Sequence, residues 1–409
     1  MRLPRPTAPY RVYRRNPLQA NPCAQENLPP RWRPTEKVRS LSFYDQLHAY
    51  REFDVAAYCA DVTPNQVARA LQKDQLSPLD FLALLAPAAE PFLEAMAQKA
   101  HQLTKQHFGR TILLYTPLYL SNYCSNRCVY CSFAAHNRLQ RKQLRLDEVE
   151  REAALIAASG LKHILLLTGD APEIASLDYL ADAIAIIKKY FTCIGVELYA
   201  LDEAGYRRLI AAGVDQMTLY QETYDEARYD QLHLWGPKKD FRFRLDAPEA
   251  ACRAGMRNVN IGALLGLAEW QRDAFFTALH GLYLQERYPS AEISFSLPRI
   301  RPHKGAFAPA CLVTDKQMVQ LMTALRLWMP RAGITISTRE TAQFRNHIVP
   351  LGVTKMSAGV STSVGGHGEP GDGEGQFEIA DPRDVSTMAA AITGLGYQPV
   401  FKDWQVFEP

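Results

Sequence analysis

The chain has 409 residues, with 46 Lys and Arg against 43 Asp and Glu, so its formal charge is only +3, and 47% of its residues are apolar. These values exclude a disordered or fibrous chain and are typical of a globular protein with one large domain or two to three small ones. No run of about 20 uncharged apolar residues occurs, so no membrane-spanning helix is expected.

Eight cysteines are too few for a disulfide scaffold in a chain of this length, and no secretory signal pattern opens the sequence. A reducing cytoplasm is therefore the expected compartment. Five cysteines, among them Cys193 and Cys311, are scattered singly and are expected to be small buried residues. Cys124, Cys128 and Cys131 lie close together and need another explanation.

Residues 1–40 hold nine Lys and Arg, two Glu and eight Pro, which predicts an extended or disordered basic arm. An arm that binds nucleic acid or a membrane surface is conceivable, but aromatic residues are sparse and the prolines interrupt any amphipathic helix. We expect neither partner. The expected role of the arm is an extension that wraps the surface or frays.

Residues 41–108 are expected to form an N-terminal helical segment. Thr63-Pro64 and Ser77-Pro78 each offer an N-cap followed by a proline at the first helical position, with apolar residues at helical spacing behind them. The stretch from Phe81 to Ala97 is the most apolar, and it is expected to be a core or interface helix.

From about residue 109 short apolar runs alternate with helical patterns, and eight such pairs predict a (β/α)₈ barrel of the TIM type over residues 109–362. The runs are apolar on both faces, as strands of a buried parallel sheet must be. The expected strands are 112–118, 163–168, 195–200, 216–220, 258–265, 292–297, 334–337 and 353–358. The expected helices are 147–159, 177–190, 203–212, 247–254, 270–286, 315–329, 339–347 and 383–395.

The last segment, residues 363–409, is expected to hold a glycine-rich loop, a closing helix and a tail. The loop runs from Gly365 to Gly375 directly after the eighth expected strand. It is either a mobile lid over the barrel or an exposed flexible loop.

The cysteine cluster Cys124-x₃-Cys128-x₂-Cys131 follows the first expected strand, at the end of the barrel where chemistry is found. Three thiolates on one loop fit three irons of a [4Fe–4S] cube and leave the fourth iron open. A zinc site completed by His136 is an alternative, as is an electron-carrying cluster with a fourth cysteine from Cys193 or Cys311. The alternative from another functional class is a non-enzymatic protein that binds a metal such as zinc at these cysteines.

With this motif after the first strand of a barrel, the chain resembles the radical S-adenosylmethionine (SAM) superfamily. The resemblance implies a [4Fe–4S] cluster whose open iron binds SAM, and cleavage of SAM to methionine and a deoxyadenosyl radical. It also implies that Tyr130, before the third cysteine, lies against the adenine.

Further SAM contacts follow from the same resemblance. Gly169-Asp170 ends the second strand where the superfamily has Gly-Glu, so Asp170 is an expected partner of the methionyl amino group despite its shorter side chain. Glu197 and Arg244 are expected to contact the ribose and the methionyl carboxylate. A plain surface salt bridge is the alternative for each of them.

Seven further stretches resemble 2-iminoacetate synthase, the tyrosine lyase of bacterial thiazole biosynthesis, over roughly residues 42–406. They are Tyr115-Thr-Pro-Leu-Tyr119-Leu-Ser-Asn, Tyr220-Gln-Glu-Thr-Tyr224, Gly236-Pro-Lys-Lys-Asp240, Gly262-Ala-Leu-Leu-Gly266-Leu, Pro298-Arg-Ile-Arg301-Pro, Ser337-Thr-Arg-Glu340 and Pro399-Val-Phe-Lys-Asp-Trp404. Ser132 departs from the family, where a glycine usually follows the third cysteine.

The resemblance implies cleavage of the Cα–Cβ bond of L-tyrosine to 2-iminoacetate and p-cresol. A free amino acid needs a cation for its carboxylate, and Arg299 or Arg301 is the expected one. Ser337 is expected to add a hydrogen bond, and Tyr115 and Tyr119 are expected to face the same pocket. Each arginine taken alone is equally well explained by a structural role.

The imine hydrolyses in water, so the resemblance implies transfer to a thiazole synthase, and it implies a flavodoxin- or ferredoxin-type electron donor. Two relatives with the same fold remain open. A tryptophan lyase needs a wider aromatic pocket. The hydrogenase-cofactor maturase that also cleaves tyrosine carries extra C-terminal cysteines, and no cysteine follows Cys311 in this sequence.

Overall fold

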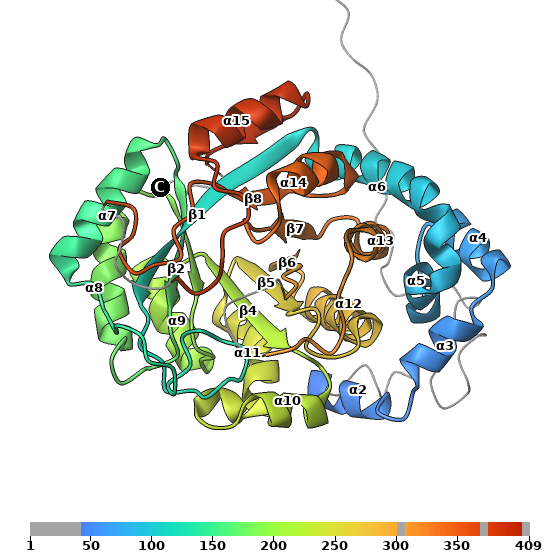
Figure 1. Cartoon of the computed structure of the whole chain (residues 1–409), viewed down its shortest axis with the longest axis horizontal. Helices are drawn as coiled ribbons and strands as arrows, with labels where there is room; N and C mark the ends of the chain where they lie inside the picture. Colours follow the sequence, from blue (N-terminus) through green and yellow to red (C-terminus); the bar gives the residue numbers. More distant parts are fainter. Residues whose placement is uncertain (1–41, 301–306, 369–374, 403–409) are drawn as a thin grey trace, which may run out of the picture.

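A computed structural model of the chain describes residues 42–300, 307–368 and 375–402. Eight parallel strands form a closed ring in which β2 to β8 follow the sequence order and β1 lies between β8 and β2 (Figure 1). The expected (β/α)₈ barrel is thereby confirmed. The strands are β1 (Thr111–Ser121), β2 (His163–Thr168), β3 (Cys193–Glu197), β4 (Gln216–Glu222), β5 (Asn258–Ala263), β6 (Glu292–Ser296), β7 (Gly333–Ile336) and β8 (Lys355–Ser357).

The strands are buried on both faces because side chains fill the barrel inside and helices cover it outside. In β2, Ile164 and Leu166 are fully buried, and Leu165 and Leu167 are nearly so. The parallel register between β2 and β3 runs from His163–Cys193 to Leu167–Glu197. All strands therefore deliver their carboxyl ends to the same end of the barrel, which is where the cysteine loop begins.

A ninth strand, β9 (Gln398–Val400), was not expected from the sequence. It pairs with the first residues of β1, from Thr111–Gln398 to Leu113–Val400. Since Leu113 also pairs with Lys355 of β8, β8 and β9 lie on opposite sides of β1. The strand β1 is therefore long enough to hold both β2 and β9 along one edge.

The outer helices agree with the predicted ones apart from their ends, with two exceptions. The short helix α10 was not expected, and α11 begins at Phe241 rather than 247, where the Asp240 side chain caps it by accepting from the Phe243 amide. The helices are α7 (Leu146–Ala158), α8 (Leu177–Ile187), α9 (Glu203–Ala212), α10 (Glu226–Leu232), α11 (Phe241–Ala254), α12 (Trp270–Arg287), α13 (Asp315–Trp328), α14 (Ala342–Ile348) and α15 (Val385–Gly394).

The N-terminal helical segment packs beside the barrel over α12 and α13 (Figure 1). The expected start at Ser77 is confirmed, because its hydroxyl accepts from the Asp80 amide while the Asp80 carboxylate accepts from the Ser77 amide. The single helix expected from Phe81 to Ala97 is wrong, since Pro87 opens a short 3₁₀ helix that divides it. The elements are α2 (Phe43–Ala49), α3 (Val55–Asp61), α4 (Pro64–Gln72), α5 (Pro78–Leu85), η3 (Pro87–Phe92) and α6 (Leu93–Phe108).

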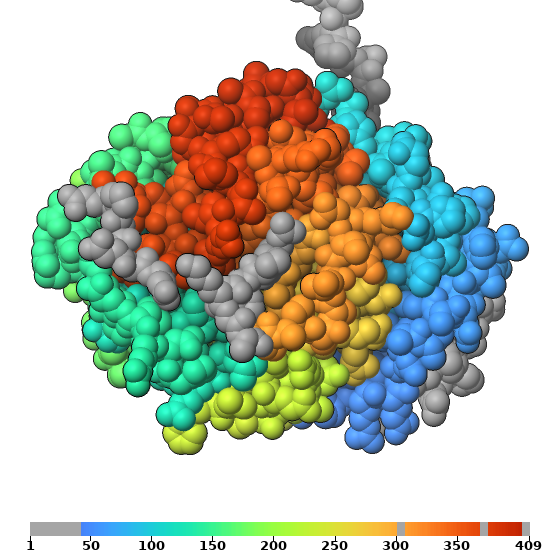
Figure 2. Space-filling view, viewed as in Figure 1, coloured from blue at the N-terminus to red at the C-terminus, as the bar shows by residue number. Residues whose placement is uncertain are grey.

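Figure 2 shows that chain from the C-terminal third, in orange and red, covers much of the face toward the viewer. The green-blue segment after β1 lies beside it on the same face. Among the described helices, none combines the length and the apolar character needed to cross a membrane. The expected arm of residues 1–40 lies outside the described residues.

Candidate active site

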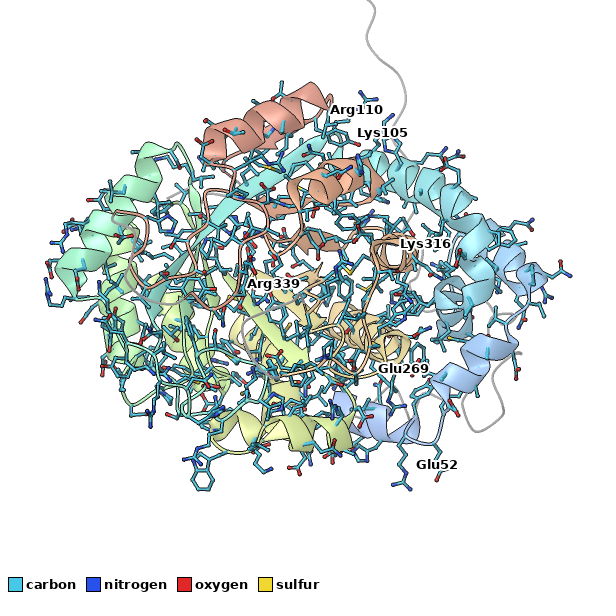
Figure 3. All side chains as sticks on the ribbon, in the orientation of Figure 1. Glu52, Lys105, Arg110, Glu269, Lys316 and Arg339 are labelled. Carbon is cyan, nitrogen blue, oxygen red and sulfur yellow. The ribbon has the colours of Figure 1, made fainter. Side chains whose placement is uncertain are left out.

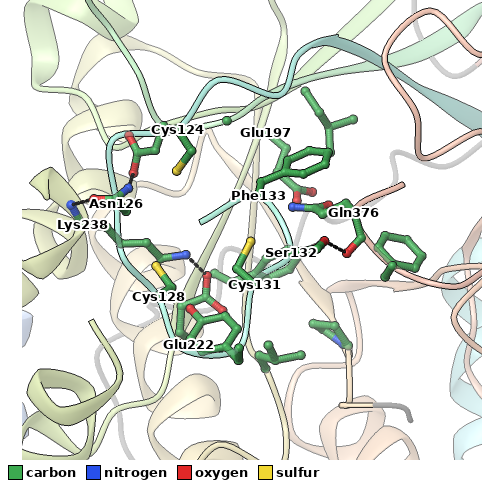
Figure 4. Close-up of a pocket in the computed structure, with 18 of the residues that line it drawn as sticks. Cys124, Asn126, Cys128, Cys131, Ser132, Phe133, Glu197, Glu222, Lys238 and Gln376 are labelled. Carbon is green, nitrogen blue, oxygen red and sulfur yellow. Dashed lines mark hydrogen bonds and ion pairs between the residues drawn. The ribbon is translucent and has the colours of Figure 1, made fainter. Parts of the chain in front are cut away.

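The three clustered cysteines lie on the loop that follows β1, and their thiols face one space (Figure 4). Hydrogen bonds hold this loop from two sides. The Ser125 amide donates to the Asp170 carbonyl at 2.9 Å, and the Arg127 amide donates to the Trp235 carbonyl at 2.9 Å. The loop is thereby fixed between the end of β2 and the segment after α10.

Asn126 fixes the middle of the cysteine loop and was not singled out from the sequence. It is buried, its Nδ2 donates to Asp170 Oδ2 at 2.6 Å, and its Oδ1 accepts from the Lys238 amide at 2.9 Å. Gly236 lies against it with φ of 102°, and a Cβ there would come within 2.2 Å of Asn126 Oδ1. Only glycine allows this contact.

The cysteines line a cavity of about 520 Å³ at the carboxyl end of the strands. Tyr130, Gly169, Asp170, Glu197 and Arg244, which were expected to contact SAM, all line the same cavity. A Cβ on Gly169 would lie 2.1 Å from the Tyr123 carbonyl oxygen, so glycine is what lets β2 end against the cysteine loop. The structure therefore brings the expected cofactor residues together.

The residues present fit a [4Fe–4S] cluster with SAM. Three thiols of one loop face the same space, and a cube takes one thiolate on each of three irons. Asp170 Oδ1 is buried without a hydrogen-bond partner, although it lines the cavity. Such an oxygen suits an ammonium group of a bound molecule.

Glu222, Lys238 and Arg244 form a charged group in the wall of this cavity. Lys238 Nζ lies 2.5 Å and Arg244 Nη2 lies 3.4 Å from Glu222 Oε1. Burial raises the pKa of Glu222, but the two cations outweigh burial and hold that pKa below its usual value. Two cations against one carboxylate leave a positive charge that suits an anionic group. Glu222 and Lys238 were not singled out from the sequence, although both lie in stretches that resemble the family.

Tyr130 is placed by an aromatic environment beside this charged group. Its hydroxyl lies 2.8 Å from His233 Nε2, and the Lys238 ammonium lies 5.7 Å from the centre of its ring. The ring of Phe307 packs edge-on to it. The ring is thus fixed in the cavity wall beside the cysteines.

A smaller cavity of about 60 Å³ lies deeper in the barrel, and it is lined by Tyr115, Tyr119, Ser337 and Ser357. Seven residues line both cavities, so the two lie side by side and share a wall; they are Leu167, Glu197, Tyr220, Pro298, Arg339, Gln376 and Phe377. We call these seven residues the neck. Burial raises the pKa of Glu197 to about 7, against the opposing attraction of Arg339.

Arg299, one of the two arginines expected to bind a substrate carboxylate, lines neither cavity. Its side chain is only 3% exposed and donates to Glu340 Oε1 at 2.8 Å and Glu340 Oε2 at 2.5 Å, to the Val313 carbonyl at 2.7 Å and to Asp315 at 2.5 Å. These contacts occupy its guanidinium. Arg301, the other candidate, lies outside the described residues.

Arg339 is the cation that the structure places at the neck instead. Figure 3 shows it inside the ring of strands, whereas Lys105 and Arg110 lie at the outer edge. Its guanidinium packs 3.7 Å from the centre of the Phe377 ring. The structure gives that guanidinium no hydrogen bond or ion pair with any residue it describes. The stretch Ser337-Thr-Arg-Glu340 contains it, but the sequence alone did not separate it from Arg299.

Comparisons with known proteins agree with this site. The model of the radical SAM superfamily matches residues 118–278, and the model of the biotin and thiamin synthesis associated domain matches residues 296–398. The chain is 39% identical to a 2-iminoacetate synthase of Salmonella typhimurium, over 89% of this chain and 97% of that protein. It is 40% identical to the enzyme of that name from Escherichia coli, over 84% and 92%.

Among solved structures, the FeFe-hydrogenase maturase HydG from Carboxydothermus hydrogenoformans is similar. It is 31% identical, the TM-score is 0.77, and the match covers 88% of this chain and 82% of that one. The similarity therefore covers most of both chains.

Proposed function

The chain belongs to the 2-iminoacetate synthase family of radical SAM enzymes, and from this we propose that it cleaves the Cα–Cβ bond of free L-tyrosine. The products are 2-iminoacetate and p-cresol. The observation that carries the proposal is the wall that the two cavities share. The cysteine-lined cavity lies beside the smaller one, and Arg339, which makes no ion pair with a described residue, lines both.

Cys124, Cys128 and Cys131 would hold three irons, and Asp170 and the Glu222–Lys238–Arg244 group would hold the two charged ends of the methionine part of SAM. When bound, the cluster and SAM supply the chemistry that removes one hydrogen atom from the substrate. The remaining steps depend on how the chain's own side chains bind and orient tyrosine.

Arg339 would pair with the tyrosine carboxylate. A guanidinium offers a carboxylate two parallel hydrogen bonds, and this one is not occupied by another carboxylate of the described chain. Ser337, Tyr115 and Ser357 lie around the same small cavity and offer hydroxyl groups near that end of the substrate. Fixing the carboxylate at the neck turns the amino group toward the larger cavity, where orientation decides which hydrogen is lost.

Loss of the amino hydrogen lets the Cα–Cβ bond break, which gives the imine and a 4-hydroxybenzyl fragment. One electron and one proton then convert this fragment to p-cresol, so the two products together contain the atoms of tyrosine. We infer a one-electron donor protein of the flavodoxin or ferredoxin type for this step and for SAM cleavage. The imine hydrolyses in water, so we also infer direct transfer to a thiazole synthase.

The test is an anaerobic reconstitution with iron and sulfide, followed by SAM, a reductant and either tyrosine or tryptophan. We expect p-cresol and glyoxylate, the hydrolysis product of the imine, from tyrosine only. Turnover of tryptophan without turnover of tyrosine would assign the chain to the indole substrate. A colourless protein with one bound zinc would contradict an enzyme of this class.

A further inference from the structure

Ser132, directly after the third cysteine, connects the cysteine loop to a segment far away in the sequence. Its hydroxyl donates to the main-chain carbonyl of Gln376 at 2.5 Å and lies 3.4 Å from that of Gly375 (Figure 4). We call residues 375–378 the strap. Both Ser132 and the strap line the larger cavity, so this hydrogen bond spans the wall of the site.

Three other contacts fix the strap to the barrel. The Gln376 amide donates to the Thr362 carbonyl at 3.2 Å, and the Thr362 hydroxyl donates to the Phe377 carbonyl at 3.2 Å. The Tyr119 hydroxyl donates to Gln376 Oε1 at 2.7 Å. These contacts come from the segment after β8 and from β1. Only the Ser132 hydroxyl ties the strap to the cysteine loop among the hydrogen bonds of the described residues.

The strap also contacts Arg339. The Phe377 ring is in direct contact with the Arg339 guanidinium, and Gln376, Phe377 and Arg339 are three of the seven neck residues. A shift of the strap therefore moves the cation at the neck relative to the cysteine loop. The distance between the cysteine loop and Arg339 therefore depends on the hydrogen bond from Ser132 to the strap.

We propose that Ser132 is a positioning residue that sets the strap, and through Phe377 the guanidinium of Arg339, in register with the cysteine loop. The inference rests on the proposed function and deepens it. With the hydroxyl in place, tyrosine held by Arg339 presents its amino group where the hydrogen is removed. Without it, cleavage of SAM continues, but a larger share of events ends without cleavage of tyrosine.

The test compares Ser132→Ala with Ser132→Thr, which keeps a hydroxyl, and with Ser125→Ala. Ser125 is a matched control because it lies on the same loop and its hydroxyl donates to the exposed Glu173 at 2.6 Å, away from the strap. Three quantities are measured on each reconstituted protein. They are the iron content, the hydrogen-exchange rate of the amides of residues 375–377, and the yield of p-cresol per 5′-deoxyadenosine.

For Ser132→Ala we expect unchanged iron, faster exchange in the strap, and a yield that falls about fivefold, the factor that corresponds to one hydrogen bond of ordinary net strength. Ser132→Thr should restore most of the yield, and Ser125→Ala should behave like the unchanged protein. Gly375→Ala provides an independent test from the strap side, because a Cβ there would lie 2.1 Å from Thr362 Oγ1 and should displace the strap with the same loss of yield.

An unchanged yield and unchanged exchange in Ser132→Ala would overturn the inference. Loss of iron in that variant would overturn it too, since the hydroxyl would then support the cluster rather than the strap. If the unchanged protein produced no p-cresol, the proposed function would fail separately, and the exchange rates would still decide whether Ser132 holds the strap.

Discussion

Arg299 and Arg339 have opposite environments although both follow barrel strands. Arg299 is buried between two carboxylates, whereas Arg339 contacts an aromatic ring at the entrance of the small cavity. The sequence could not separate them because the partners of Arg299 are remote in sequence. Asp315 begins α13 and Glu340 follows β7, so only the fold reveals that this guanidinium is already paired.

For Arg339→Ala we expect the KM for tyrosine to rise about 10- to 150-fold, the factor for losing a charge-assisted pair of about 1.5–3 kcal/mol. The Lys variant should recover little, since an ammonium lacks the planar fork. The measurement is p-cresol formation against tyrosine concentration. Tyrosine-independent cleavage of SAM serves as the control and should persist. Normal tyrosine kinetics in Arg339→Ala would contradict its assignment.

For Arg299→Ala we expect lower stability rather than a specific loss of substrate binding. Removing one partner of a buried ion pair leaves the other charge unpaired, at a cost of about 3–5 kcal/mol. Thermal unfolding of the protein without cofactors measures this, with Arg339→Ala as the matched control. Equal melting temperatures for Arg299→Ala and the unchanged protein would refute the structural role.

Each cysteine of the loop is expected to be essential, because each thiolate binds a different iron. Single Ala variants at Cys124, Cys128 and Cys131 should fail to retain a stable cluster, as measured by iron and sulfide content after reconstitution. Cys193→Ala and Cys311→Ala are the controls and should keep both cluster and activity. A full cluster in any one of the three loop variants would show that the ligands are assigned incorrectly.

The cysteine loop was predictable because its ligands are local in sequence. The roles of Asn126, Glu222 and Lys238 were not, because each depends on contacts between separate loops. Glu222 even adopts a positive φ of 71°, which its sequence does not indicate. Residues whose function depends on neighbours distant in the chain remained hidden until the fold placed them.

Among the secondary-structure elements, the strands were predicted best. Buried parallel strands are short continuous apolar runs between turns, and this pattern is clear at β2, where the expected and observed ranges coincide. The short elements α10 and β9 escaped because neither is long enough to show a period. The structure splits the expected helix at Phe81–Ala97 because Pro87 lacks the amide that would continue α5.

The helix α12 carries a titratable group that should give the fold a pH-dependent stability. Asp273 accepts from the Thr223 hydroxyl at 2.9 Å and the Tyr224 amide at 2.8 Å, but its Oδ2 is buried without a partner. Burial raises the pKa of Asp273 to about 7. In the unfolded chain its pKa is about 3.9. At pH values between these two pKa values the folded state binds more protons than the unfolded chain, so the free energy of unfolding decreases as the pH rises.

The prediction is that this loss spans roughly pH 4 to 7 and levels off above the folded-state pKa. Asp273→Asn, which keeps an oxygen acceptor for both donors, should remove this part of the dependence. The measurement is the free energy of unfolding in urea at several pH values, taken as the difference between the two proteins so that other titrating groups cancel. A difference that does not change with pH would contradict the prediction.

At the scale of the whole molecule, the number of alternating units was enough to predict the barrel. The position of the N-terminal helices beside α12 and α13 was not predictable, since amphipathic helices do not specify which surface covers their apolar face. The helix α5 illustrates this, because every residue from Phe81 to Leu85 is buried, and part of what covers them is α12 and α13 from much later in the chain.

Deletion of residues 1–40 is expected to leave fold and chemistry unchanged. The first described helix has its own N-cap, in which the Ser42 hydroxyl accepts from the Asp45 amide at 3.2 Å, and the deletion retains that residue. The measurements are the melting temperature and the p-cresol yield of the shortened protein. Loss of cleavage activity in a soluble, folded truncated protein would instead assign the arm a role in closing the active site.

The pairing of β1 with β8 and β9 has a consequence for how the chain is made. A ribosome releases β1 and the cysteine loop early. The strands β8 and β9, which pair with the first residues of β1 on its two edges, emerge only after most of the polypeptide has been synthesised. The nascent barrel is therefore an open sheet for much of translation, at about 5–20 residues per second. During that interval the cysteine loop lacks the part of its cavity wall that Arg339 and residues 375–378 later supply.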